Sequence, residues 1–211
     1  MNMIWGKWHH LYKMTLQWLA EQWSTKQGLT QQWGKVIRWT GMVFLASVLS
    51  GCSAELDEYQ SQSPAFDLFG YFEGETRAWG MVQDYTNKQT RRFYVSLTGT
   101  VKGDTLVLDE QFVYDDGEKD TRVWTIERLP DGRYRGKADD IIGVALGQEK
   151  GNALRWQYDF LLKYGEGSEM TVSFDDWLYR QDAHHVFNLT SIRKLGIEVA
   201  TVTLFFRKET F

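Results

Sequence analysis

The chain has 211 residues, 43% of them hydrophobic and 15% aromatic, with 24 basic and 28 acidic side chains. This length and apolar content are sufficient for a domain with a real hydrophobic core. The formal net charge of −4 makes the chain a poor candidate for binding nucleic acid or an anionic membrane surface.

The first predicted segment is a secretory signal. Residues 39–51 are apolar or small at nearly every position, and Lys35 and Arg38 precede them. A basic region, a short apolar region and small residues at its end are typical of such signals. The apolar run has 13 residues, fewer than the about 20 that a transmembrane helix needs. We therefore predict that residues 1–51 are a signal segment outside the folded domain.

This signal segment is longer than usual. Signals run about 15–30 residues, whereas 51 residues precede the cysteine. Translation from a non-AUG codon at Leu29 or Val36 would give a signal of ordinary length, and a long basic region is the alternative. We expect the later start.

The only cysteine, Cys52, directly follows the apolar run. The stretch Leu49-Ser50-Gly51-Cys52 resembles the bacterial lipobox, a leucine and two small residues before a cysteine. The resemblance implies that a diacylglyceryl group is attached to the Cys52 thiol, that a signal peptidase cuts before this residue and that the freed amine is also acylated. Two or three chains anchor a protein stably, because each buried CH₂ contributes about 0.8 kcal/mol. The alternative is a buried structural cysteine that follows an apolar helix by chance.

The chain from Cys52 onward is strongly acidic. Five basic residues and one acidic residue lie before Cys52, so residues 52–211 carry 19 basic and 27 acidic side chains, a net charge of −8. Once Cys52 is lipidated, no thiol remains for a disulfide, for catalysis or for a metal site. Residues 52–65, rich in Ser, Gln, Asp and Glu, are predicted to be a flexible tether between the lipid and the domain. Ser53, rather than Asp, follows the cysteine, which in enterobacteria-like sorting implies passage to the outer membrane, with the domain facing the periplasm.

Residues 66–211 are predicted to form one all-β domain. Turn signals recur at short intervals, and runs of alternating apolar and polar residues lie between them. Such spacing favours a single antiparallel up-and-down barrel of about eight to ten strands, lipocalin-like or calycin-like, and a sandwich is the alternative. Only residues 191–195 are expected to make a helical turn. The turn signals are Lys102-Gly103-Asp104, Asp115-Asp116-Gly117, Pro130-Asp131-Gly132, Lys150-Gly151-Asn152 and Gly165-Glu166-Gly167.

An aromatic face suggests what such a barrel could hold. In residues 152–163, Trp156, Tyr158 and Phe160 share one face with neighbouring leucines, and Trp124 lies in another alternating run. A barrel of about eight strands has room for one small ligand. Aromatic walls without a catalytic motif are typical of a binding site for an apolar ligand. We therefore predict that Trp124, Trp156 and Tyr158 line a ligand site.

Two runs carry a charge on an otherwise apolar face. Glu110 lies on a face with Leu108 and Phe112, and Arg122 lies on a face with Trp124. If both faces point inward, Glu110 and Arg122 could meet inside the barrel, where a buried charge must be paired. The pair would be a polar floor or a clamp for a ligand carboxylate. If the faces point outward, the arginine stem simply covers the tryptophan. We include Glu110 and Arg122 in the predicted ligand site.

Three glycines, Gly143, Gly147 and Gly151, are spaced four residues apart. In a strand this spacing puts them on one face, where glycine permits the close approach of a backbone or ligand. The alternative is that they serve as bend and turn residues. No Gly-Lys-Ser/Thr follows, so the stretch is not a phosphate-binding loop.

Carboxylates and imidazoles gather near residue 180, which raises the question of a metal site. Adjacent residues on a strand point to opposite faces, so neither the two histidines nor the paired aspartates can readily share one ion. We predict a surface turn, no metal and no cofactor. The residues concerned are Asp175, Asp176, Asp182, His184 and His185.

Several pieces of sequence, taken in order, resemble a family of uncharacterised proteobacterial lipoproteins, domain of unknown function 3833. The resemblance runs from about Phe66 to Lys208 and includes FEGETRAWG, LDEQFVYDDGEKDTRVW, GKADDIIGVALGQEKGNALRWQYDF, DDWLYR and GIEVATVTLFFRK. It implies a lipid-anchored envelope protein and supplies no catalytic residues.

Three functions remain open from the sequence. The first is a membrane-anchored barrel that binds a small apolar or lipid-like ligand. The second is an enzyme of the same architecture, with Glu110 or Asp140 as general base on a lipid-like substrate. The third is an envelope scaffold with a filled barrel. A hollow interior would separate the first from the third.

Overall fold

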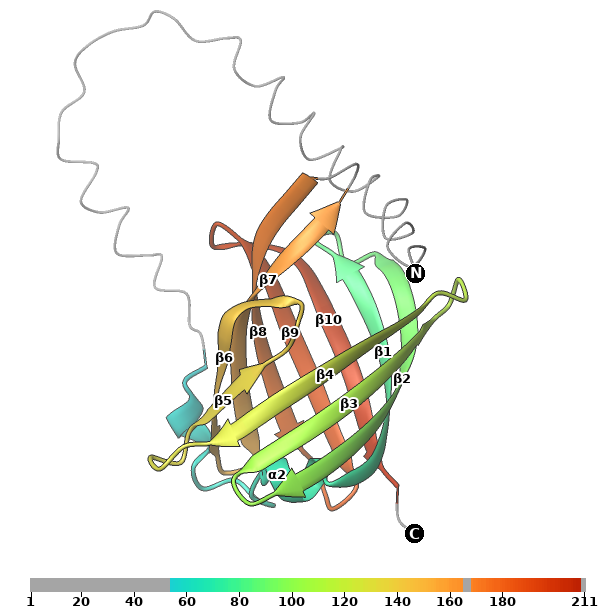
Figure 1. Cartoon of the computed structure of the whole chain (residues 1–211). Coiled ribbons are helices and arrows are strands. Elements are labelled where there is room, and N and C mark those ends of the chain that lie inside the picture. The colour runs from blue at the N-terminus through green and yellow to red at the C-terminus, as the bar shows by residue number, and fades with distance from the viewer. Residues whose placement is uncertain (1–53, 165–167, 210–211) are drawn as a thin grey trace, which may run out of the picture. The chain divides into compact units, whose positions relative to one another are not determined.

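The computed structural model describes residues 54–164 and 168–209, and in this part of the chain ten strands form one closed antiparallel barrel (Figure 1). The predicted signal segment and Cys52 lie outside the described residues. The strands are β1 (Gly74–Asp84), β2 (Gln89–Lys102), β3 (Thr105–Tyr114), β4 (Lys119–Arg128), β5 (Tyr134–Lys137), β6 (Ile141–Lys150), β7 (Ala153–Tyr164), β8 (Ser168–Arg180), β9 (His185–Lys194) and β10 (Ile197–Lys208).

The topology is that of a simple up-and-down barrel. Each strand pairs with the next one in the sequence, and β1 pairs with β10 to close the sheet. The predicted turn signals fall between strands: for example, Gly103 and Gly117 adopt positive φ, which glycine tolerates, in the turns after β2 and β3. The predicted barrel is therefore confirmed, and the alternative of a sandwich is wrong.

Two local predictions are wrong. Residues 191–195 make no helical turn, because residues up to Lys194 continue β9, paired with β10. A short helix, α2 (Leu68–Phe72), appears where only strands were expected. Asp67 caps its N-terminus by accepting a hydrogen bond from the Gly70 amide.

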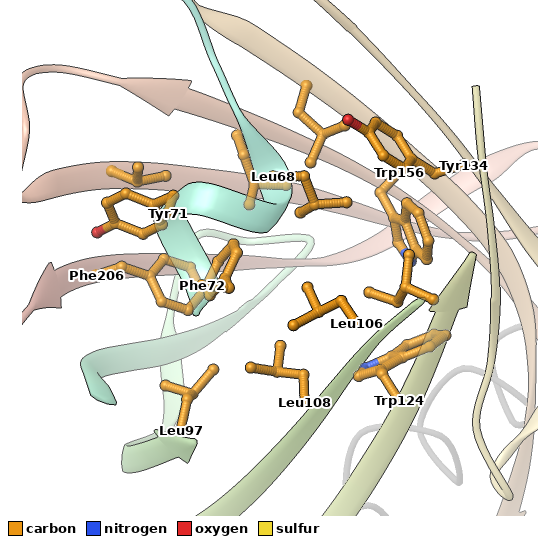
Figure 2. Close-up of a cluster of buried hydrophobic side chains, with 14 of the residues drawn as sticks. Leu68, Tyr71, Phe72, Leu97, Leu106, Leu108, Trp124, Tyr134, Trp156 and Phe206 are labelled. Carbon is orange, nitrogen blue, oxygen red and sulfur yellow. The ribbon is translucent and has the colours of Figure 1, made fainter. Parts of the chain in front are cut away.

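Helix α2 closes one end of the barrel (Figure 1). Its four apolar side chains, Leu68, Phe69, Tyr71 and Phe72, are all buried. Figure 2 shows Leu68, Tyr71 and Phe72 in one cluster with leucines and tryptophans of the strands. Gly99 lies so close to the carbonyl oxygen of Phe72 that no Cβ would fit there. The main hydrophobic core therefore lies in the half of the barrel next to α2.

The folded domain begins earlier than predicted. A 3₁₀ helix, η1 (Leu56–Tyr59), precedes α2 and packs against β6 and β7. The Tyr59 ring lies 5.9 Å from Trp177 and 5.5 Å from Tyr179, centroid to centroid. Residues 56–65, which belong to the expected tether of residues 52–65, are therefore part of the packed structure, because Tyr59 contacts aromatic rings on the outer face of β8.

The barrel wall is irregular beside β5. This strand has only four residues, and it pairs with β4 only from Thr125 to Arg128. Among the described residues, positions 119–124 of β4 thus have a strand partner on the β3 side alone. The turn between β5 and β6, which carries Asp140, lies beside this unpaired stretch of β4 and contacts it through Arg122.

Candidate ligand-binding site

The barrel interior has a packed half and an open half. Next to α2, inward-pointing residues such as Leu106, Ile126 and Leu154 are almost completely buried. Farther from α2, Leu162, Val172 and Ile192 are still buried, but many other inward-pointing side chains are only partly buried. Since the strands surround them, this accessible surface faces the space inside the barrel, its open end or the stretch beside β5 where the wall is incomplete. We call this region the open half, and its partly buried side chains include Phe93, Glu110, Phe112, Arg122, Phe160, Phe174 and Leu204.

Glu110 and Arg122 both point into the barrel, as one of the two sequence interpretations required. They stand directly opposite each other in the register of β3 and β4. The faces they occupy contain the buried Leu108 and Trp124, so the alternative of an outward arginine is wrong. Their position follows from the pleat, because every second residue of these strands continues the inner face.

The Arg122 guanidinium is held by Asp140 rather than by Glu110. Its Nε and Nη2 atoms lie 2.7 and 2.6 Å from Oδ2 of Asp140. The two side chains keep 23% and 34% of their surface accessible, although Arg122 lies among the strands. The ion pair links β4 to the turn before β6, next to the stretch where β4 has no strand partner on that side.

Asp176 brings a third carboxylate to the interior. It lies on β8, is 7% exposed and accepts a hydrogen bond from the Thr190 hydroxyl of β9. Asn188, also on β9 and also 7% exposed, points to the same side. The expected surface turn at Asp175 and Asp176 is therefore wrong: both belong to β8, with Asp175 on the outer face, where it pairs with Arg155 at 2.7 Å.

Aromatic rings surround these charges. The Arg122 guanidinium carbon lies 5.9 Å from the ring centroids of Phe112 and Trp124 and 5.8 Å from that of Phe160. Tyr158 stacks on Phe174, with ring centroids 4.9 Å apart. The site therefore combines a few charged groups with an apolar wall, which is the usual composition of a small-molecule site.

Burial changes the acid–base behaviour of the cluster. Removal from water raises the pKa of Glu110 to about 7, opposed by Arg122 and reinforced by Asp140 and Asp176. Removal from water also raises the pKa of Asp176 to about 6, against the hydrogen bond from Thr190. The pKa of the Tyr158 hydroxyl rises well above its usual value for the same reason. Glu110 and Asp176 thus change charge near neutral pH.

Two predicted site residues lie in the packed half. Trp156 is 7% exposed and its ring fits against Gly136 and Gly147, where an added Cβ would overlap it. Its ring also meets that of Trp124 edge to face at 5.7 Å. Trp124 extends from this core toward Tyr158, at 5.4 Å between centroids. Glu110, Arg122 and Tyr158 therefore lie at the open half, whereas Trp156 lies in the packed half and contacts Trp124.

The spaced glycines have separate uses. Gly147 seats the side-chain ring of Trp156, which neither interpretation named. Gly143 and Gly151 adopt positive φ, as the alternative required, Gly143 within the irregular stretch of β6 and Gly151 in the turn before β7. Gly151 also meets the close-approach interpretation, because the backbone carbonyl of Tyr59 leaves no room for a Cβ there.

Sequence comparison places the chain among known families. Residues 46–208 match the model of a family described as "Protein of unknown function (DUF3833)". The chain belongs to this family. No curated protein matches the sequence. Among solved structures, this DUF3833 chain is similar to an S-type phycobiliprotein lyase, CPES, from Guillardia theta, with 10% identity and a TM-score of 0.46 over 68% of this chain and 92% of that one. A likeness of this degree carries no argument about function.

Two of the residues near position 180 that raised the question of a metal site, Asp182 and His184, lie at a turn of the DUF3833 domain. Within residues 54–164 and 168–209, no three His, Asp or Glu side chains gather in a way that could hold a metal ion. Asp182 instead binds the backbone amides of His184 and His185 at the turn before β9, as predicted for a surface turn. No helix in the described residues is both long and apolar enough to cross a membrane.

The sequence carries a signal for the inward position of Asp176. Met170, Val172 and Phe174 alternate on one face, and the same period of two continues to Asp176 and Leu178. Asn188 and Thr190 carry no comparable signal, since polar residues on a strand are usually placed on the outer face.

Proposed function

We propose that the protein is a lipid-anchored lipoprotein of the bacterial envelope whose barrel binds a small, largely apolar ligand in its open half. One observation carries the binding proposal: aromatic side chains and a charged cluster point into a closed barrel and yet remain partly accessible. A filled scaffold would bury these side chains. Ionised groups inside a protein cost free energy, so their retention favours a use for them.

The anchor part of the proposal depends on the sequence. Cys52 lies within the stretch matched by the family model, which begins at residue 46. A lipid on Cys52 would tether the barrel to the outer membrane, and the acidic domain would lie in the periplasm.

The second candidate is an enzyme in the same barrel. A carboxylate with a pKa of about 7, such as Glu110, is suited to act as general base near neutral pH. Asp140 is less suited, because it is engaged by Arg122.

Native mass spectrometry tests the binding proposal. We expect the full-length protein, purified from its own membrane, to release a non-covalent ligand on mild activation. Leu204→Trp would enlarge an inward-pointing, partly buried side chain and should remove this adduct. Thr203→Trp makes the same addition on the outer face of β10 and should leave it. Absence of any adduct, or one that persists undiminished in Leu204→Trp, would contradict the proposal.

A further inference from the structure

The interior carries more hydrogen-bond acceptors than free donors. Three carboxylates, Glu110, Asp140 and Asp176, face one guanidinium, that of Arg122. Both Nε and Nη2 of this guanidinium are already engaged by Asp140. Nearer the open end, Arg91 is likewise paired with Glu118. Among the described residues around Arg122, a ligand therefore meets an excess of negative charge.

Some of these acceptors have no partner. The side-chain oxygen of Asn188, a residue 93% buried on the inner face of β9, accepts no hydrogen bond from the described residues. The same holds for Oδ1 of Asp140. The Glu110 carboxylate also accepts no hydrogen bond from the described part of the chain, although its oxygens keep some accessible surface. Buried acceptors without partners are costly, so each indicates a donor that arrives from elsewhere.

From these contacts we infer, building on the proposed function, that the ligand carries a cationic hydrogen-bond donor, such as a protonated amine, on an apolar body. The head group would lie between Glu110, Asp176 and Asn188, and the apolar part would contact the phenylalanines of the open half. A primary ammonium has three donors and no acceptor, which complements this set. The phenylalanine rings of the open half attract a cation further.

The same geometry disfavours a fatty acid. The sequence left open that an arginine could clamp a ligand carboxylate. Asp140 takes the Nε and Nη2 edge of Arg122, so a ligand carboxylate would be left mainly with Nη1 and would also lie near Glu110 and Asp176. Like charges that lie close together in a poorly solvated site repel each other strongly.

The inference predicts a pH dependence of binding. Glu110 on β3 is faced by Arg122 on β4, Asp140 before β6, Tyr158 on β7 and Asp176 on β8. A cation binds better when Glu110 and Asp176 are ionised, and their pKa values of about 7 and 6 place this change between pH 5.5 and 8. An alkylamine remains protonated throughout this range. Amine affinity should therefore rise with pH by about tenfold or more.

Three probes with the same chain separate the alternatives. Octylamine, octanol and octanoate are titrated by calorimetry into the full-length protein in zwitterionic lipid nanodiscs, with empty nanodiscs as blank. At pH 8 we expect octylamine to bind about tenfold more tightly than the other two, and to lose this advantage at pH 5.5.

Matched variants locate the effect. Glu110→Gln and Asp176→Asn should each weaken octylamine binding about tenfold and leave octanol binding almost unchanged. Glu127→Gln and Asp159→Asn make the same chemical changes on the outer face and should change neither. Circular dichroism verifies that each variant is folded, and the pH dependence of the wild type provides a test that needs no variant.

The outcomes distinguish this inference from the proposed function. Octanoate binding as tightly as octylamine, or octylamine binding that does not depend on pH, would overturn the cationic head group and leave the binding barrel intact. If none of the three probes binds, the proposed function itself is contradicted.

Discussion

At the scale of residues, Glu110 and Asp176 are held in a site that resists their ionisation. Their pKa values are raised because the surrounding strands remove water, and Arg122 compensates only in part since Asp140 engages it. Each carboxylate therefore lowers the free energy of unfolding when it is charged. Such a cost at an inner wall is expected where binding, rather than stability, selects the residue.

The pH dependence of the free energy of unfolding measures this destabilisation for Glu110. The folded-state pKa of Glu110, about 7, exceeds its ordinary value of 4.5, so protonation favours the folded state. The free energy of unfolding should fall by up to about 3 kcal/mol as the pH rises from about 4.5 to 7, and it should stay low above pH 7. Glu110→Gln should be more stable than the wild type at pH 8 and less sensitive to pH, in urea unfolding followed by tryptophan fluorescence. A variant that is less stable than the wild type at pH 8 would refute this account, and Glu127→Gln is the control.

Gly147 offers a second test at this scale. A Cβ at this position would overlap the ring of Trp156, which Gly136 and Trp124 hold on its other sides. Gly147→Ala should therefore lower the free energy of unfolding by about 1–3 kcal/mol. Gln148→Ala, on the outer face of the same strand, should change it by less than about 0.5 kcal/mol. Equal effects of the two substitutions would show that the ring can move away freely.

At the scale of elements, α2 decides which end of the barrel is filled. Five residues are too few for a helix to be stable alone. Burial of its apolar side chains against the strands stabilises it, and Lys208 of β10 donates hydrogen bonds to carbonyl oxygens at its C-terminal end. The lysine Nζ lies 3.1, 2.6 and 2.6 Å from the carbonyl oxygens of Gly70, Tyr71 and Glu73.

Removing this lysine should loosen the closed end. Lys208→Met keeps the length of the side chain and removes hydrogen bonds to three carbonyl oxygens, so we expect a loss of about 1–3 kcal/mol in the free energy of unfolding. Protease cleavage near residues 66–73 should become faster. Lys137→Met, at an exposed position of β5, is the matched control. Unchanged cleavage in Lys208→Met would mean that apolar packing alone holds α2.

At the scale of the whole molecule, the proposal joins an anchor to a barrel. Cys52→Ser should abolish acylation and leave an uncleaved precursor, as measured by metabolic labelling with a fatty-acid analogue. Ser53→Asp should preserve the label and, under enterobacteria-like sorting, retain the protein in the inner membrane on fractionation. A Cys52→Ser protein that still labels and matures would contradict the lipobox interpretation.

The sequence by itself determined the barrel. Alternation with period two and regularly spaced turns specify strands that pair with their neighbours, and these signals are local. They also put Glu110, Arg122 and Tyr158 on faces that point inward in the structure, and the same alternation continues beyond Phe174 to Asp176.

Only the tertiary structure decided which inner residues meet and how the interior is filled. The pairing of Arg122 with Asp140, 18 residues away, depends on the short β5 and the turn that follows it. The packing of α2 into one end depends on Gly99, far along the chain, leaving room for its backbone. The free acceptor of Asn188 is visible only when every neighbouring donor has been placed. Contacts of this kind arise from barrel closure, which joins residues distant in sequence, and therefore no local pattern encodes them.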